Sequence, residues 1–167
     1  MLLDSLPKFA DPERLADLLT ELEGEVDLSK LTRLRELAPD NDGKASMRLS
    51  FRRDEMKRAV MDGRAEASLA LVCQRCGAPI LSHTEVEWQI VFAQSEDDER
   101  VLADQGRDVW YHDGPVNVAE ILEEELMLAL PMAPRHLENC EPQQQQAVAP
   151  HPFAALAGLF EHGLRDK

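Results

Sequence analysis

The sequence has few cysteines, few aromatic residues and little positive charge, and each scarcity argues against a class of protein. Three cysteines in 167 residues cannot all be paired within one chain, so we expect a reducing compartment rather than a disulfide framework. Aromatic residues make up 5% of the chain, which disfavours a surface that stacks the bases of single-stranded nucleic acid. The net charge of −14 disfavours nucleic-acid binding over the whole surface, because phosphates attract clustered Lys and Arg.

Long apolar runs and common catalytic signatures are also missing. No run of about 18 apolar residues is present to cross a membrane, and Asp4 interrupts the N-terminal apolar stretch before a signal peptide could form. The chain has no glycine-rich phosphate loop, no Gly-x-Ser-x-Gly elbow and no His-Glu-x-x-His motif. We therefore expect a cytoplasmic protein that is not an enzyme and has neither a membrane partner nor a small-molecule substrate.

Residues 1–140 are predicted to form a single α+β domain that begins with a short helix. Asp11 is a suitable N-cap, and Pro12 suits the first helical position. The helix would carry one apolar stripe, formed by Leu15, Leu18, Leu19 and Leu22.

A second helix is predicted near residues 117–130. Asn117 can cap it, Glu120 stands at the capping-box spacing, and Pro131 marks its end. Its carboxylate run, "EILEEEL", is expected to be a solvated face. The buried stripe would consist of Ala119, Leu122, Leu126 and Leu130.

Between these helices the apolar residues recur with a period of two, which indicates strands. Alternation runs through residues 47–51, resumes after "MDGR" at residues 65–71, and continues through residues 86–92. We expect an antiparallel sheet or a partly open barrel. The charged segment "SEDDER" lacks periodicity and is expected to be a mobile, solvated loop.

The region after Cys140 divides into two parts. Residues 141–151 are rich in Gln and Pro and predict a flexible linker. Residues 152–165 predict a short C-terminal helix, which could either dock on a partner or pack on the protein's own sheet. Its candidate docking residues follow helical spacing: Phe153, Leu156 and Phe160.

The motif "CQRCG" places Cys73 and Cys76 in a turn between two predicted strands, and Gly77 permits the positive φ that such a turn needs. A second pair, His136 and Cys140, would complete a Cys3His set for one structural zinc ion. Two alternatives stay open. In the first, Cys73 and Cys76 are only small hydrophobic residues of a hairpin and Cys140 is an exposed loop thiol. The second is a redox pair, which the flanking strands and Pro79 disfavour. The other histidines are expected to be surface polar groups: His83, His112, His151 and His162.

Positive charge gathers in one window of the sequence. Residues 44–75 contain eight basic and four acidic residues, so this window carries +4 and the remainder of the chain −18. A window of this kind could contact RNA phosphates, although a basic strand edge can also serve only to prevent aggregation. The candidate RNA contacts are Arg48, Arg52, Arg53, Lys57 and Arg58.

Three blocks of sequence, "LVCQRCGAPI", "EILEEELMLALPMAPRHLENC" and "HPFAALAGL", occur in this order. Together they resemble the YceD family of large ribosomal RNA subunit accumulation proteins. The resemblance covers roughly the C-terminal two thirds of the chain. It implies a non-enzymatic role in the synthesis, processing or stability of 23S ribosomal RNA.

Two direct partners are compatible with that role. The first is a precursor of large-subunit ribosomal RNA, held by the basic window. The second is a basic ribosomal protein, which the acidic remainder of the chain would hold before assembly. Hydrolysis of RNA at a metal is the least favoured reading, because cysteine-rich ligation indicates a closed structural site.

Overall fold

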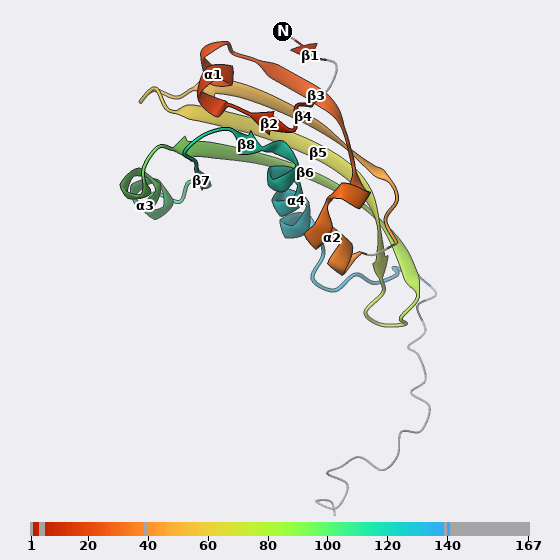
Figure 1. Cartoon of the computed structure of the whole chain (residues 1–167). Helices are drawn as coiled ribbons and strands as arrows, with labels where there is room; N and C mark the ends of the chain where they lie inside the picture. The colour runs from red at the N-terminus through yellow and green to blue at the C-terminus, as the bar shows by residue number, and fades with distance from the viewer. Residues whose placement is uncertain (1, 4–5, 39, 139, 141–167) are drawn as a thin grey trace, which may run out of the picture.

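The computed structural model describes residues 2–3, 6–38, 40–138 and 140, and it shows an α+β protein as predicted (Figure 1). Six strands form one sheet in the order β1-β3-β4-β5-β6-β7, and β2 pairs with β8 in a second, small sheet. In chain order the elements are β1 (Leu2–Leu3), β2 (Phe9–Ala10), α1 (Pro12–Asp17), β3 (Glu21–Asp27), the 3-10 helix η1 (Leu28–Lys30), α2 (Thr32–Leu37), β4 (Lys44–Arg53), β5 (Ala59–Val72), β6 (Pro79–Ala93), α3 (Glu96–Asp104), β7 (Val109–Tyr111), β8 (Val116–Asn117) and α4 (Val118–Ala129).

Strands β3 to β6 form the antiparallel sheet that the alternation predicts. Strands β1 and β7 pair parallel with its two edge strands, β3 and β6. Inward side chains of these strands pack with α1, α4 and the small sheet in one core on the concave side (Figure 1). The side chains that alternate with them point to the opposite, outer face. Within the described residues, no helix is long and apolar enough to cross a membrane.

Helix α1 begins where predicted, because the Asp11 carboxylate accepts a hydrogen bond from the Arg14 N–H (3.2 Å). It ends at Asp17, and shortly afterwards Leu19 adopts a left-handed conformation (φ 48°) as the chain turns towards β3. The predicted leucine stripe is therefore wrong beyond Leu15, since Leu18 and Leu19 are exposed after the helix and Leu22 is buried in β3 rather than on α1.

Strand β5 is longer than the alternation after "MDGR" suggests. It starts at Ala59, so the "MDGR" segment itself, with Gly63, lies within the strand. The turn between β4 and β5 is made by residues 54–58, where the Asp54 carboxylate accepts the N–H groups of Met56 and Arg58 (both 2.9 Å).

The acidic segment expected to be a mobile loop is helix α3, so that prediction is wrong. Ser95 caps the helix by accepting the Asp98 N–H (3.1 Å), and acidic residues fill its first turn, where the helix dipole favours them. On the outer face of the sheet, Leu102 packs with Val60 and Val91. Those valines need an apolar cover, a requirement that appears only once the strand register is known.

Helix α4 has the predicted cap, because the Asn117 side chain accepts the Ala119 N–H (3.1 Å). One glutamate of the carboxylate run departs from the solvated face expected for it. Glu123 is buried, and its Oε1 accepts the N–H groups of Arg33 (2.7 Å) and Leu34 (3.1 Å) at the start of α2. A carboxylate on one helix thus caps another helix, which explains its burial.

The buried stripe of α4 is only partly as predicted. Leu122 and Leu126 are fully buried, whereas Ala119 and Leu130 are half-buried. The full set of buried side chains on α4 is Val118, Ile121, Leu122, Glu123 and Leu126.

Candidate functional site

The candidate metal centre begins in the turn between β5 and β6. Cys73 N–H donates to the Ala78 carbonyl (2.9 Å), and Gly77 N–H donates to the Cys73 carbonyl (2.9 Å). Gly77 has a φ of 72°, a backbone conformation that residues with a Cβ rarely adopt. This geometry turns the sulfurs of Cys73 and Cys76 towards the same point, as expected for two ligand atoms supplied by one turn.

The other half of the site comes from the segment after α4, which folds back onto this turn. Gln74 N–H donates to the Pro134 carbonyl (2.8 Å) and thereby fixes the returning segment against the hairpin. His136 Nε2 lies 3.1 Å from the Pro79 carbonyl and can donate to it. That hydrogen bond would leave Nδ1 without a proton, which is the state a metal ligand needs.

The four predicted ligands come together. The sulfurs of Cys73, Cys76 and Cys140 and a ring nitrogen of His136 all lie within 4.8 Å of one another. Cys73 Sγ is 3.5 Å from Cys140 Sγ, and Cys76 Sγ is 3.4 Å from His136 Nδ1. Tetrahedral zinc with bonds of about 2.3 Å to sulfur places ligand atoms about 3.7 Å apart. The cluster therefore has the size and the donor set of a Cys3His zinc site.

The environment of the thiols separates their pKa values. Burial of Cys73 disfavours its thiolate, but N–H groups of Cys76, Arg75 and His136 donate to the sulfur and lower its pKa to about 5. Burial and the neighbouring sulfurs raise the pKa of Cys140 to about 11. A divalent cation is the kind of charge that would stabilise all three groups as thiolates together.

The helix that a redox pair of this type requires is not seen at Cys73. Cys73 follows β5 in a turn and is not at the N-terminus of a helix. A helix dipole therefore does not contribute to the lowered pKa of Cys73, which comes from the N–H groups of the turn and of His136.

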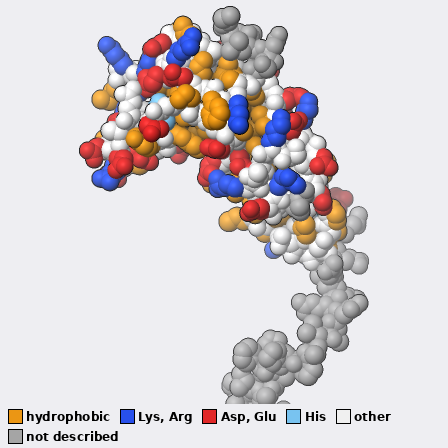
Figure 2. All heavy atoms as spheres, viewed as in Figure 1, with side chains coloured by type: hydrophobic (Ala, Val, Ile, Leu, Met, Phe, Trp, Pro, Cys, Tyr) orange, Lys and Arg blue, Asp and Glu red, His pale blue; other side chains and the backbone are white. Residues whose placement is uncertain are grey.

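The basic window does not form a single basic surface. Arg48 pairs with Glu23 (2.9 Å), and Arg52 pairs with Asp62 (2.9 Å), both on the outer face. Figure 2 likewise shows Lys and Arg side chains interspersed with Asp and Glu on the visible face. Lys57 is exposed, and among the described carboxylates none lies within ion-pair distance of it.

The other two candidate RNA contacts lie in structural ion pairs. Arg53 points towards α1, where it pairs with Glu13 and Asp17, and its side chain is 26% exposed. Arg58 is 18% exposed and pairs with Asp54 (2.8 Å) in the turn before β5. These two guanidinium groups hold the fold together, so their charges are only partly available to a phosphate.

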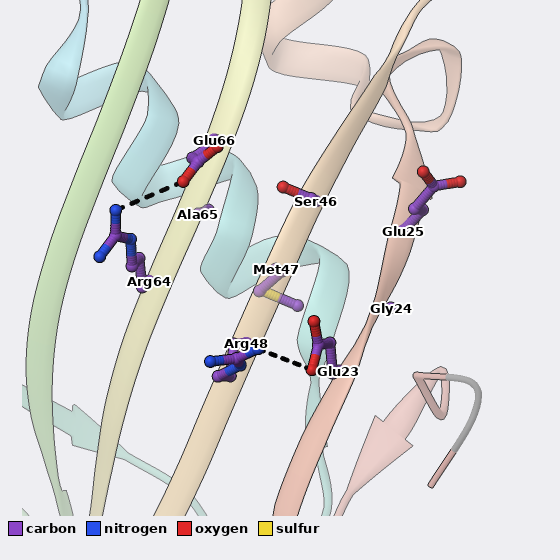
Figure 3. A pocket seen from close by; sticks show the side chains of 9 residues that line it. All are labelled: Glu23, Gly24, Glu25, Ser46, Met47, Arg48, Arg64, Ala65 and Glu66. Atoms are coloured by element: carbon purple, nitrogen blue, oxygen red, sulfur yellow. Dashed lines mark hydrogen bonds and ion pairs between the residues drawn. The ribbon is translucent and has the colours of Figure 1, made fainter. Parts of the chain in front are cut away.

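The outer face of the sheet carries a depression of about 390 Å³ that the sequence did not indicate (Figure 3). It is lined by charged residues of β3, β4 and β5, with α4 on the opposite side of the sheet. In this depression, Glu23 contacts Arg48 and Glu66 contacts Arg64. Cross-strand register, which places Arg48 directly opposite Arg64, is the signal that could have revealed this charged row.

Of the other histidines, His83 is exposed as expected, but the expectation is wrong for His112. The His112 side chain is 9% exposed and packs edge-on against Phe92, with ring centroids 5.4 Å apart. His151, His162 and the predicted linker and C-terminal helix, with the docking residues Phe153, Leu156 and Phe160, lie outside the described residues.

Comparison with known proteins agrees with the motif. Residues 61–160 match the family described as "Large ribosomal RNA subunit accumulation protein YceD". A curated protein of that name from Haemophilus influenzae is 31% identical over 166 residues, covering 92% of this chain and 95% of the relative. No solved structure gives a significant match.

Proposed function

Because the chain belongs to the YceD family of large ribosomal RNA subunit accumulation proteins, we propose that it is a non-enzymatic ribosome biogenesis factor. It supports the synthesis, processing or stability of 23S ribosomal RNA. The observation that carries this proposal is the match along nearly the whole chain to a relative named for that role. A protein with this function would work in the cytoplasm.

The metal centre is proposed to be structural rather than catalytic. Four protein ligands, Cys73, Cys76, His136 and Cys140, are enough to fill a tetrahedral zinc shell, which leaves no position for water or substrate. With ligands from both segments, such a site would join the β5–β6 hairpin to the segment after α4. This junction is supported by the hydrogen bonds that Gln74 and His136 already make across it.

Direct contact with ribosomal RNA is the first proposed mode of action. Of the five candidate RNA contacts, Arg48, Arg52 and Lys57 are exposed, and they would supply phosphate contacts. Arg53 and Arg58 would contribute through the local potential rather than as free side chains, because carboxylates already engage them.

A second candidate is an adaptor that holds a basic ribosomal protein before assembly. The pairing of four of the five candidate arginines and lysines with carboxylates favours it, since this pairing reduces the positive potential that RNA binding needs. The excess of acidic residues over the whole chain would attract a basic partner and speed their encounter.

Depletion of the protein from its own cells tests the function. The ratio of large-subunit to small-subunit ribosomal RNA should fall and should recover when the intact chain is supplied. Ultraviolet crosslinking in the same cells separates the two modes, because only the first yields RNA attached to this chain. An unchanged ribosomal RNA ratio after depletion would contradict the proposed function.

A further inference from the structure

The outer edge of β6 lacks a partner strand over most of its length. β6 pairs with β5 from Pro79 to Val91 on one side, whereas β7 pairs with it only at Val91–Ala93 on the other. In Figure 1, β6 forms the margin of the main sheet, with only the short β7 beyond it. Within the described part of the chain, the outer edge is therefore unpaired from Pro79 to Ile90.

The backbone groups at this edge alternate in a known way. Val91 N–H donates to the Asp108 carbonyl (2.9 Å), and the Ala93 carbonyl accepts from His112 N–H (3.3 Å). The backbone N–H and C=O groups of the odd-numbered residues of β6 therefore point away from β5, towards the outer edge of the sheet. The N–H and C=O groups that point to this outer edge nearer the hairpin make no backbone hydrogen bond there with any described residue. They belong to Leu81, His83, Glu85, Glu87 and Gln89. Such a row is a template for adding a strand.

The side chains along this edge make it acidic. Glu85 and Glu87 lie on the outer face, and both reach Arg64 of β5, which also pairs with Glu66. Three carboxylates share one guanidinium, which leaves a local charge of −2. The Glu87 side chain is 71% exposed and its contact with Arg64 is 3.3 Å, so it is free to engage a second cation.

The same negative character continues beyond the edge at the β7 end. Burial, together with the charges of Asp108 and Glu124, raises the pKa of Glu125 on α4. None of the described cations forms an ion pair with Glu125 or with Asp108.

The acidity also selects among possible occupants. If the β6 edges of two copies of this chain paired antiparallel across a twofold axis close to Glu85, near the middle of the unpaired stretch, Glu85 and Glu87 of one copy would approach the same residues of the other. Like charges opposite one another across strands are destabilising. The edge is therefore unsuited to a second copy and suited to a basic strand, because opposite charges at those positions stabilise the pair.

We propose that the outer edge of β6 is a docking strand for an extended, Lys- and Arg-rich segment of a partner protein. The segment adds to the sheet as a further strand, with alternate basic side chains on the outer face beside Glu85 and Glu87. Backbone hydrogen bonds supply affinity, and the two carboxylates supply selectivity for basic sequence. This inference rests on the adaptor form of the proposed function and gives it a site.

A synthetic peptide that alternates Lys with Val and Thr is the probe. Its binding to the intact, metal-replete protein should slow amide hydrogen exchange at Leu81, His83, Glu85, Glu87 and Gln89, measured residue by residue by NMR. The same peptide, N-methylated on its pairing edge, keeps its charge but cannot donate those hydrogen bonds, so it should bind at least about tenfold more weakly.

Charge reversal tests the selectivity. Glu85→Lys combined with Glu87→Lys should weaken peptide binding at least about tenfold. The matched pair Glu21→Lys and Glu25→Lys lies on the same face of the sheet but on β3, and it should leave binding within about twofold. These substitutions are at exposed positions, so circular dichroism should show that both variants fold.

Three results would overturn the proposal. In the first, the N-methylated peptide binds as tightly as the unmethylated one. In the second, the β3 variant loses as much peptide affinity as the β6 variant. In the third, a uridine oligonucleotide binds at the β6 edge in preference to the peptide. None of them bears on the ribosomal RNA ratio in depleted cells, so failure of this site and failure of the proposed function are distinguishable.

Discussion

The indole ring of Trp88 fills the space that a Cβ atom on Gly63 would occupy. The two residues are directly opposite each other in β6 and β5. A Cβ built on Gly63 would lie 2.6 Å from the ring Nε1 and closer still to Cε2 and Cζ2. Glycine is needed here for close approach and not for a turn, because Gly63 lies in the middle of a strand.

Gly63→Ala should therefore destabilise the protein by roughly 1–3 kcal/mol, since the buried Trp88 ring must move out of a packed core. Urea denaturation measures the change. Gly114→Ala is the matched control, because a Cβ there has nothing within 4 Å. A variant at Gly63 that unfolds at the same urea concentration as the control would contradict the packing argument.

The purified, reduced protein should contain about one zinc ion per chain. Removing the metal with a chelator should lower Tm by several degrees, because a metal that binds only the folded state stabilises it by mass action. Cys76→Ser and His136→Ala should each reduce the metal content, whereas His83→Ala, at an exposed histidine of β6, should not. Elemental analysis that finds no bound metal in a reducing preparation would refute the zinc assignment.

Glu123→Ala should cost about 1–3 kcal/mol of folding free energy, because it leaves two N–H groups at the start of α2 without their acceptor. Glu36→Gln, at an exposed position on α2, serves as the control and should have little effect. Thermal unfolding measured on both variants compares them directly. If the two unfolded alike, the buried carboxylate would not be the cap that supports α2.

Glu125 predicts a pH dependence of stability. Burial and the neighbouring charges of Asp108 and Glu124 raise its pKa in the folded protein. A raised carboxyl pKa means that folding favours the protonated form, so this group reduces stability as the pH rises through its folded pKa. Glu125→Gln should therefore raise Tm modestly at pH 7, and the difference should vanish below the ordinary glutamate pKa of about 4.3. A variant with an unchanged or lower Tm at pH 7 would contradict this assignment.

Deleting residues 150–167 tests whether Phe153, Leu156 and Phe160 dock on a partner. A docking segment is not needed for folding, so the truncated protein should keep its Tm while losing its ribosomal precursor or protein partner in a pull-down assay. If the truncated protein unfolds several degrees earlier, the segment belongs to the core instead.

The sequence determined the features that depend on neighbours along the chain. Alternating apolar residues identified the inward faces of β4, β5 and β6, since side chains on a strand point to opposite faces in turn. Asn117 predicted the start of α4 because a cap acts within one turn. The spacing of Cys73 and Cys76 likewise predicted half of the candidate metal site, because both residues lie in a single turn.

Only the tertiary structure decided the features that depend on residues far apart in the sequence. His136 reaches Cys76 because α4 returns the chain to the hairpin, and spacing alone could not show that path. Helix α3 forms over Val60 and Val91, whose need for cover follows from strand register and not from the acidic sequence that covers them. The charge of the basic window has the same limitation. Its arginines can be counted from the sequence, but ion pairs across strands and helices determine which of them remain free of a carboxylate partner. Coulomb energy depends on distance in space, and the fold alone sets that distance.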